Sequence, residues 1–386
     1  MLKKDITFIY MDSAEKSIYE PIALEAQRRG YTVKMTENKF EKCEIGFYCQ
    51  HVNFPQYSKF SVIMLHDIIQ QYGNWPDIWM REPWNKYDVG ILPSKQWVKN
   101  WQESSGKYYT MPRKGIYEVG WPKADFVANV NREEYKKNFY EKYNLDLSKK
   151  TVLYAPAWEN DHKQDDFVQS MLKLDVNILI KQYNATPEVM PEQYKNIQEM
   201  YELHKDNKRV TLLDTRMNIF DAIMASDVLV SEESSTMCEA VMMGIPAVSV
   251  SNWLIPDVTP SRYPECNYDF VIMTKKECLA DCVAEIINDY ENYQKETIAF
   301  RDNTFSNIGK VASIIMDIID DCVSGTVIRY KSLKPTERRV LSIKENLKHV
   351  GLRIYKEVCY NYRVRYKLVE RMWNVARRIK HALIKK

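Results

Sequence analysis

Short apolar runs alternate with amphipathic stretches over the first third of the chain. One apolar run is followed by an amphipathic stretch over residues 14–29, which ends at Gly30 and leads into the next run. Strand, helix and strand in this order are typical of the start of a doubly wound parallel sheet. The runs with strand character cover residues 6–11, 31–36, 44–50, 61–66, 87–92 and 115–120. We therefore predict a Rossmann-like α/β domain over residues 1–128.

A second alternating series follows a polar helix predicted at residues 132–143 and closes with helices predicted at 276–300 and 309–323. Its strands are predicted at residues 151–154, 176–180, 209–213, 227–230, 247–250 and 270–273. The chain has 386 residues, more than one hydrophobic core usually spans, which favours two domains. The two series predict an α/β fold with two parallel-sheet domains facing a cleft, the second over residues 129–326.

The most informative segment, ASDVLVSEESSTMCEAVMMGIPAVSV at 225–250, has the pattern of strand, polar turn, helix and strand. Ser234, Ser235 and Thr236 lie where the helix must begin, and its free N–H groups, positive dipole end and hydroxyls favour a phosphate. Glu239, one turn later, is placed to accept hydrogen bonds from a ribose. The segment predicts a nucleotide-diphosphate site, with an ordinary helix N-cap as the alternative.

His66 follows an apolar strand pattern, so its imidazole is expected at the carboxyl edge of the first sheet, facing the cleft. Histidine titrates near neutral pH, which suits it there to take a proton from an acceptor hydroxyl. Asp67 is placed to orient the imidazole. The alternatives are a buried histidine bonded to a backbone carbonyl and an aspartate that simply forms a turn.

Further candidates lie beside the domain boundary and at a later strand end. Lys181 follows the strand at 176–180 and is a candidate counter-charge for a diphosphate. The polar and aromatic boundary loops are expected to line the cleft, where an aromatic ring stacks on a base or sugar, or covers the sheet edge. These candidates are Gly120, Pro122, Lys123, Asp125, Tyr154, Pro156, Trp158 and Glu159. Lys123 is a candidate phosphate ligand or an exposed lysine; His162 and His204 are expected on the surface.

The eight cysteines and six histidines show no paired Cys-Xaa-Xaa-Cys or His-Xaa-Xaa-Xaa-His spacing, so no metal is expected. Most cysteines fall in apolar patterns, which suits reduced thiols in a cytosolic protein. The amino terminus lacks a signal-peptide pattern, and no window approaches the ~18 apolar residues of a membrane-spanning helix. We expect a cytoplasmic location.

The end of the chain is a strongly basic tail. Residues 329–386 hold 18 lysines and arginines against 4 acidic residues, a charge of +14, which leaves −11 on the rest of a chain whose total is +3. Apolar residues recur at helical spacing over 340–358 and 364–383, so 327–386 is predicted to form basic amphipathic helices. Such helices favour an anionic membrane surface, although the apolar stripe can also pack on the domains. Nucleic acid is disfavoured, because the rest of the chain is acidic and holds no recognisable nucleic-acid module.

Four features in a fixed order carry a family likeness. They are His66 at a strand end, the Gly-Xaa-Pro-Xaa-Xaa-Asp pattern at 120–125, LYAPAW at 153–158, and SDVLVSEESS at 226–235 followed by a helix and Gly-Xaa-Pro. This order resembles the CDP-glycerol glycerophosphotransferases, which implies a GT-B fold and an enzyme of teichoic-acid and capsule polymer synthesis at the cytoplasmic face of the membrane. The resemblance further implies that His66 is the base and that Ser234 and Ser235, with Ser231 beside them, hold the donor phosphates.

Three places in the chain, one residue and two short stretches, depart from the family pattern. Asp67 stands where the family has Gly, residues 181–184 read Lys-Gln-Tyr-Asn where it has Lys-Xaa-His-Pro, and residues 231–235 read Ser-Glu-Glu-Ser-Ser where it has Thr-Asp-Tyr-Ser-Ser. The family's second histidine helps to bind the diphosphate, so a different nucleotide donor is an open alternative. Residues 238–240 and 244–246 also resemble sugar-nucleotide transferases and UDP-N-acetylglucosamine 2-epimerases.

We expect a transferase without metal or cofactor, with CDP-glycerol or another nucleotide-diphosphate as donor substrate and a lipid-linked glycan as acceptor, peripheral at the inner face of the cell membrane. His66 is expected to deprotonate the acceptor hydroxyl, while Ser234, Ser235, Lys181 and helix amides stabilise the leaving phosphate. The alternatives are a UDP-sugar glycosyltransferase or hydrolysing sugar-nucleotide 2-epimerase of the same fold, and a non-catalytic scaffold that binds nucleotide or glycan and docks on the membrane.

Overall fold

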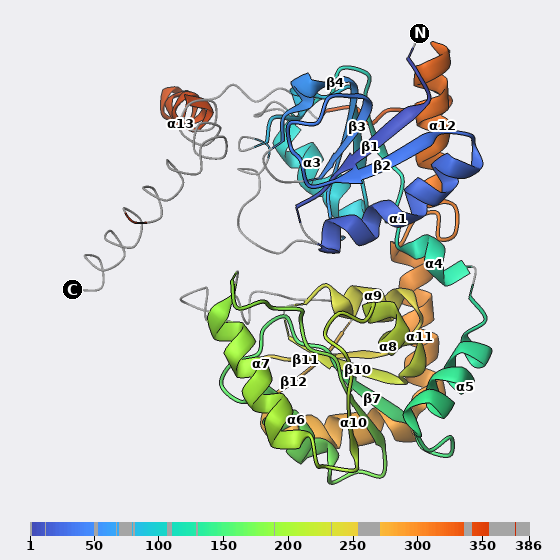
Figure 1. Ribbon diagram of the computed structural model, residues 1–386, viewed down its shortest axis with the longest axis vertical. Helices are drawn as coiled ribbons and strands as arrows, with labels where there is room; N and C mark the ends of the chain where they lie inside the picture. The colour runs from blue at the N-terminus through green and yellow to red at the C-terminus, as the bar shows by residue number, and fades with distance from the viewer. Residues whose placement is uncertain are drawn as a thin grey trace.

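The computed structural model describes residues 2–11, 13–49, 53–66, 68, 79, 82–105, 110–128, 130–188, 190–232, 234–253, 271–335, 342–354 and 375. Within these ranges the strands form two six-stranded sheets, each with helices around it (Figure 1). All neighbouring strands within each sheet run parallel. The α/β fold with two Rossmann-like domains is therefore confirmed.

The first sheet has the strand order β2-β1-β3-β4-β5-β6. Its strands are β1 (Asp5–Ile9), β2 (Thr32–Thr36), β3 (Cys43–Cys49), β4 (Ser58–Met64), β5 (Val89–Leu92) and β6 (Ile116–Glu118). Side chains alternate between the two faces of the sheet. Phe8 is buried in the core with α1 (Ser13–Arg28), while Ile9 is buried in the core with α3 (Lys95–Ser105). Helices therefore cover both faces, as an all-parallel sheet requires.

The second sheet has the strand order β12-β11-β10-β7-β8-β9. Its strands are β7 (Thr151–Tyr154), β8 (Asn177–Ile180), β9 (Val210–Leu212), β10 (Val228–Ser231), β11 (Ala247–Val250) and β12 (Ile272–Thr274). Leu153 is buried with α8 (Ile219–Ala225) and α9 (Thr236–Met242), and Val152 is buried on the opposite face with α6 (Lys163–Met171). Helices α5 (Arg132–Tyr143) and α7 (Pro191–His204) also belong to this part.

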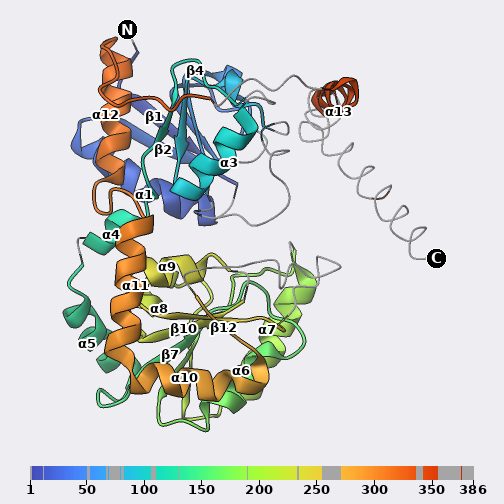
Figure 2. The same cartoon turned by 180° about the vertical axis from the view of Figure 1, so that it is seen from behind.

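The helix predicted at residues 276–300 is not continuous. A 3₁₀ turn at Lys276–Cys278 precedes α10 (Leu279–Asn288), and α11 (Tyr290–Thr304) begins only after Asp289, whose backbone (φ −119°, ψ 38°) is not helical. Asn and Asp are weak helix formers, which favours a break here. The break changes the direction of the chain, so that α11 runs from the second domain toward the first (Figure 2).

Helix α12 (Val311–Ser324) packs on the first domain although it follows the second in sequence (Figure 2). Its residues Ile315 and Ile319 share a core with Phe8. Arg29 at the end of α1 donates hydrogen bonds to Asp317 at 2.7 Å and to Asp320 at 2.8 Å. The chain therefore crosses between the domains twice. The boundaries 1–128, 129–326 and 327–386 stay a prediction, but α12 packs with the first of these ranges and not with the second.

The two crossings contact each other around Gly120. This residue has φ +107°, which side chains rarely adopt, and a Cβ here would overlap the carbonyl oxygen of Ser306. The Asp125 carboxylate accepts hydrogen bonds from the backbone N–H groups of Val311 at 2.8 Å and Ala312 at 2.7 Å, which caps α12. We expected Gly120 and Asp125 to line a cleft. The structure instead uses both to join the crossings, through contacts too distant in sequence for a local pattern to reveal.

The start of the tail packs on the first domain, and its next helix does not. The N–H of Leu333 donates to the Ile116 carbonyl at 2.9 Å, beside the edge strand β6. Helix α13 (Ile343–Ile354) exposes Ile343, Leu347 and Val350, which share one helix face. The apolar run at 364–383 lies outside the described residues, apart from position 375. In the part of the chain that the structure describes, no helix has the length and apolar character needed to cross a bilayer.

We expect Gly120→Ala to destabilise the protein more than Gly325→Ala does. Both glycines have positive φ, but a Cβ at Gly325, which ends α12, has no atom within 4 Å. The backbone conformation alone costs about 1 kcal/mol in each variant. The overlap with Ser306 adds about 1–3 kcal/mol for Gly120→Ala. Urea unfolding measures the free energy of unfolding of both variants. Equal values for the two variants would contradict a close contact between Gly120 and Ser306.

Candidate functional site

Each sheet has one point at which the strand order reverses. It lies between β1 and β3 in the first sheet and between β7 and β10 in the second. Loops that leave the two strands at such a point diverge, which favours ligand binding outside the carboxyl ends of the strands. In Figure 1, α1, which follows β1, and α9, which follows β10, lie on the sides of the two domains that are next to each other. The topology therefore brings the candidate residues to two facing sheet edges.

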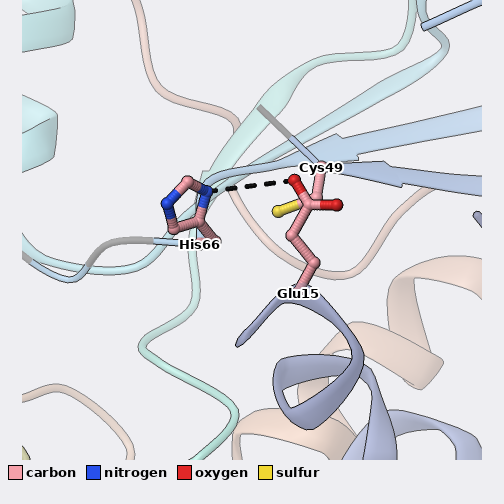
Figure 3. A group of neighbouring side chains, drawn as sticks. All are labelled: Glu15, Cys49 and His66. Carbon is pink, nitrogen blue, oxygen red and sulfur yellow. Dashed lines mark ion pairs between the residues drawn. The ribbon is translucent and has the colours of Figure 1, made fainter. Parts of the chain in front are cut away.

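At the first reversal point, His66 lies with Glu15 and Cys49 (Figure 3). His66 follows β4, Cys49 ends β3, and Glu15 lies in the first turn of the helix after β1. The His66 Nδ1 is 4.0 Å from the Glu15 Oε1. The other oxygen of Glu15 accepts the backbone N–H of Met11 at 2.7 Å, which orients the carboxylate. The His66 side chain is 19% exposed and that of Glu15 only 1%, so a buried carboxylate lies beside an accessible imidazole.

Sequence reasoning missed Glu15 and chose Asp67 as the orienting residue. Asp67 lies outside the described residues, so its role stays a prediction. Glu15 is 51 positions before His66, and only the strand order brings the two together. The available signal was an acidic residue at the start of the helix after the first strand, a place at the same sheet edge as His66.

The segment after β4 is tied to the second domain. The indole Nε1 of Trp121 donates to the His66 carbonyl at 3.3 Å. Trp121 and Ile68 are both buried in the core that includes Met237 and Ala240 of α9. His66 therefore lies at the edge of the first domain next to α9, the helix predicted to border the donor phosphates.

On the second domain, Lys181 carries a buried amine at the end of β8. It is 8% exposed, and its Nζ donates to the carbonyls of Gln182 at 3.0 Å and Thr215 at 2.9 Å. Burial lowers the pKa of Lys181 to about 8, against the opposing charges of Asp214 and Glu239. A buried cation without a carboxylate in hydrogen-bond contact is costly, which favours a place where an anionic ligand binds.

Lys123 and Glu239 form a buried ion pair between the boundary loop and α9. The Lys123 Nζ donates to the Glu239 Oε1 at 2.6 Å and lies 5.0 Å from the centre of the Trp121 ring. We expected Lys123 to bind phosphate and Glu239 to bind ribose, and in the structure they bind each other. Because Lys181 also interacts electrostatically with Glu239, the three predicted residues form one charged cluster.

The hydroxyl groups after β10 separate into two kinds. Ser231 is fully buried and donates to the carbonyl of Ala155 at 2.7 Å, so it joins β10 to the end of β7 and does not face a ligand. Thr236 donates to the same carbonyl at 3.2 Å and to the Ser234 Oγ at 3.0 Å. Ser235 is exposed at the N-terminal boundary of α9 without a side-chain capping bond. Ser234 and Ser235 therefore remain the candidates for donor binding here.

Two residues expected in the cleft are inside the second domain instead. Tyr154 is fully buried against Phe167, with ring centres 5.1 Å apart, and its hydroxyl donates to Glu159 at 3.1 Å. Burial raises the pKa of Glu159 to about 7. Their strand-end position suggested exposure, but α6 covers this part of the sheet.

Other candidates also differ from their expected exposure. Pro122 and Pro156 are buried, and Trp158 is half-buried. His204, expected on the surface, is buried on α7.

Glu232 fills a position at which α/β proteins commonly bind anions. Its Oε1 accepts the backbone N–H groups of Ala157 at 3.0 Å and Trp158 at 3.1 Å, and Lys163 donates to it at 3.3 Å. The amides at the end of β7 are thus already bound by the protein's own carboxylate. A donor phosphate would find its partners on the other side of the reversal point, at Ser234 and Ser235.

The fold and the facing sheet edges define a two-domain α/β protein of the GT-B type. More particularly, the chain belongs to the CDP-Glycerol:Poly(glycerophosphate) glycerophosphotransferase family, whose model matches residues 78–319. Lys181, Ser234 and Glu239 fall within the matched range, and His66 precedes it.

Proteins of teichoic-acid synthesis are among the relatives. The chain is 24% identical over 159 residues to the Teichoic acid poly(glycerol phosphate) polymerase of Staphylococcus epidermidis, which covers 40% of this chain and 20% of that protein. It is 23% identical over 177 residues to the Teichoic acid glycerol-phosphate transferase of Staphylococcus aureus, which covers 45% of this chain and 44% of that protein. The chain thus spans less than half the length of these relatives.

Solved structures show the same fold. The Wall Teichoic Acid Polymerase TagF aligns with a TM-score of 0.57 at 18% identity over 83% of this chain and 89% of that chain. The UDP-GlcNAc 2-epimerase of Neisseria meningitidis, bound to UDP-GlcNAc, aligns with a TM-score of 0.57 at 12% identity over 82% of this chain and 100% of that chain. At these identities the likeness shows the fold alone.

We expect Lys181→Met to remove a pH-dependent contribution to the free energy of unfolding. The pKa of the amine is about 8 in the folded protein and 10.5 for an unperturbed lysine, so the unfolded chain binds more protons between these pH values. The wild type should therefore gain stability relative to the variant as pH rises through this window, by up to about 3 kcal/mol at ~1.36 kcal/mol per pK unit. Below pH 8 the full cost of the buried charge remains.

Urea unfolding at several pH values measures this difference. Lys208→Met, at an exposed lysine, is the control and should keep the pH dependence of the wild type. Equal pH slopes for the wild type and Lys181→Met would contradict a buried, charged amine at the end of β8.

Proposed function

We propose that the protein transfers glycerol phosphate, or a related polyol phosphate or sugar, from CDP-glycerol or another nucleotide-diphosphate donor to a membrane-linked glycan acceptor. The proposal is supported by two observations: His66 pairs with Glu15 at the carboxyl ends of the first sheet's strands and accepts a hydrogen bond from Trp121 through its carbonyl, and Lys181, Glu239 and Lys123 form a buried charged cluster beside α9. Membership of the glycerophosphotransferase family supports this choice of transferred group.

In the proposed reaction, His66 takes the proton of the acceptor hydroxyl. Its Nδ1 faces Glu15, so Nε2 is the nitrogen available to the acceptor. The acceptor oxygen forms a bond to the donor phosphorus that carries glycerol, and the bond from that phosphorus to the bridging oxygen breaks. The nucleotide monophosphate leaves with the electron pair. Glu15 stabilises the imidazolium that forms, in the manner of a carboxylate that orients a catalytic histidine.

The leaving phosphate gathers negative charge, and the second domain would stabilise it. Lys181 supplies a cation whose burial cost an anion offsets, and Ser234 and Ser235 supply hydroxyl donors. Groups that are already in place need little reorganisation during the reaction, which is the main source of electrostatic catalysis. Glu239 keeps one carboxylate oxygen beyond the one bound by Lys123, and that oxygen is the proposed ribose acceptor.

The acceptor is proposed to be lipid-linked, and the tail to hold the protein at the inner membrane surface in teichoic-acid or capsule synthesis. Ile343, Leu347 and Val350 form an exposed apolar face on α13, and Lys344 and Lys348 lie on the same helix. Each basic residue near acidic lipids contributes on the order of 1 kcal/mol. A protein docked in this way meets its acceptor in two dimensions, with the sheet edges free for the donor.

The alternatives differ in what releases the nucleotide. A hydrolysing 2-epimerase or another UDP-sugar enzyme is the second candidate, because Tyr183 stands where the family has a histidine that helps to bind the diphosphate. The test is incubation with CDP-glycerol and a panel of UDP- and CDP-sugars, with and without a lipid-linked acceptor. Release that needs the acceptor supports the transferase, release without it supports the epimerase, and binding without release supports a scaffold.

We expect His66→Ala to lower kcat by about a hundred- to ten-thousandfold in the acceptor-dependent assay, the usual contribution of a general base. Glu15→Gln should lower kcat less, because the imidazolium loses a neighbouring negative charge while the imidazole keeps the nitrogen that accepts the proton. His162→Ala, at an exposed histidine, is the control. Near-normal turnover in a folded His66→Ala protein would rule out the base.

A chain that ends at Pro335 should keep its fold and lose binding to anionic vesicles. This end point retains the Leu333 contact with Ile116, which a cut before Arg329 would remove. Sedimentation with phosphatidylglycerol vesicles measures binding, and phosphatidylcholine vesicles are the control. Unchanged pelleting of the shortened chain would argue against docking through the tail.

A further inference from the structure

The cluster of Glu15, Cys49 and His66 offers three different metal-ligating groups at one point. One carboxylate oxygen, one thiol sulfur and one imidazole nitrogen all lie within 4.8 Å of one another (Figure 3). They come from three separate segments, which meet because β1, β3 and β4 are neighbours at the reversal point. No local Cys or His spacing reveals such a group.

The chemistry of the three groups selects a class of cation. A thiolate with an imidazole suits Zn²⁺ or Co²⁺ and disfavours Mg²⁺ and Ca²⁺, which require oxygen ligands. Ligand atoms lie at about 2.0–2.3 Å from zinc, so the present spacing needs only small side-chain rotations to close around the ion. Glu15 is already oriented by the Met11 N–H, in the way that an outer hydrogen bond orients a metal ligand.

Burial also favours a cation of charge +2 at this place. A carboxylate and a thiolate together neutralise the ion, so the complex with a neutral imidazole carries no net charge. Glu15 and Cys49 are each 1% exposed, where an uncompensated charge is costly. The partly exposed His66 leaves a route for the ion and a side on which a fourth ligand, such as water, can bind.

We propose that Glu15, Cys49 and His66 bind one Zn²⁺-like cation reversibly, and that the bound cation inhibits transfer. Binding releases the thiol proton of Cys49 to solvent and forms a metal–thiolate bond. Coordination through the His66 Nδ1 leaves the remaining ring proton on Nε2. That nitrogen then has no lone pair with which to accept the proton of an acceptor hydroxyl. The binding part of the proposal is independent of the proposed function, whereas the inhibition rests on it.

Spectroscopy of the wild-type chain tests binding without an activity assay. Titration with Co²⁺ should give a thiolate-to-cobalt charge-transfer band that saturates at one ion per chain, and Zn²⁺ should abolish the band. X-ray absorption of the zinc-loaded protein should find one sulfur at about 2.3 Å together with nitrogen and oxygen ligands. A spectrum with nitrogen and oxygen alone, or binding without saturation, would overturn the site.

Two serine variants of the same strand separate the site from general thiol binding. Cys49 ends β3 and Cys43 begins it. Cys49→Ser should abolish the charge-transfer band and weaken Zn²⁺ binding at least about tenfold. Cys43→Ser should behave as the wild type, and equal affinity in the two variants would contradict the assignment. If Cys49→Ser does not fold, two measurements still test the site. They are the X-ray absorption spectrum of the zinc-loaded wild type and the Zn²⁺ affinity of Glu15→Gln, which should be lower than that of the wild type.

Inhibition is measured as the rate with Zn²⁺ divided by each protein's own metal-free rate. We expect the ratio to fall in the wild type and in Cys43→Ser and to stay near one in Cys49→Ser. Equal inhibition of all three proteins would contradict the inhibitory role. If no donor is turned over by any of them, the proposed function fails while the spectroscopic result stands by itself.

Discussion

The return of α12 to the first domain is the constraint on which the arrangement of the protein depends. It requires the chain to cross between the domains a second time, next to the first crossing, and the contacts around Gly120 and Asp125 hold the two crossings together. With both connections on one side, the sheets are held with their carboxyl edges facing each other (Figure 1).

Burying a charge at these sheet edges costs free energy. For Lys181 this cost appears as a lowered pKa. Lys123 and Glu239 neutralise each other, and Glu232 is stabilised by backbone amides and Lys163. Removing either partner of such a pair leaves an uncompensated charge, so these contacts fix loop positions strongly. Lys181 differs because its hydrogen-bond partners are carbonyls. This difference, more than its sequence position, makes Lys181 a candidate partner for an anion.

Much of the fold could be predicted because periodicity is local. The strands at 151–154 and 247–250 and the helix at 132–143 have the bounds that their patterns indicate. The destination of α12 could not be predicted in this way, since an apolar helix face does not encode which domain it covers. The break at Asp289 was missed for a related reason, because the apolar spacing continues through it.

The candidate site was predictable only in part. His66 and Lys181 lie just after β4 and β8, as their patterns indicated, since parallel strands bring their carboxyl ends to one edge. They do not tell which side chain faces outward, so Tyr154 and Ser231 were assigned to ligands although both are buried. The partner of His66 depends on strand order, which no single segment encodes, and so Glu15 came only with the structure.

The central expectation is that one donor molecule binds between the two reversal points. Determination of the structure with CDP-glycerol bound is the most direct test. We expect the diphosphate within hydrogen-bond distance of Lys181 and of Ser234 or Ser235, with the glycerol-bearing phosphorus turned toward His66. A donor held at the amides of Ala157 and Trp158, with Glu232 displaced, or one bound away from His66, would contradict the account.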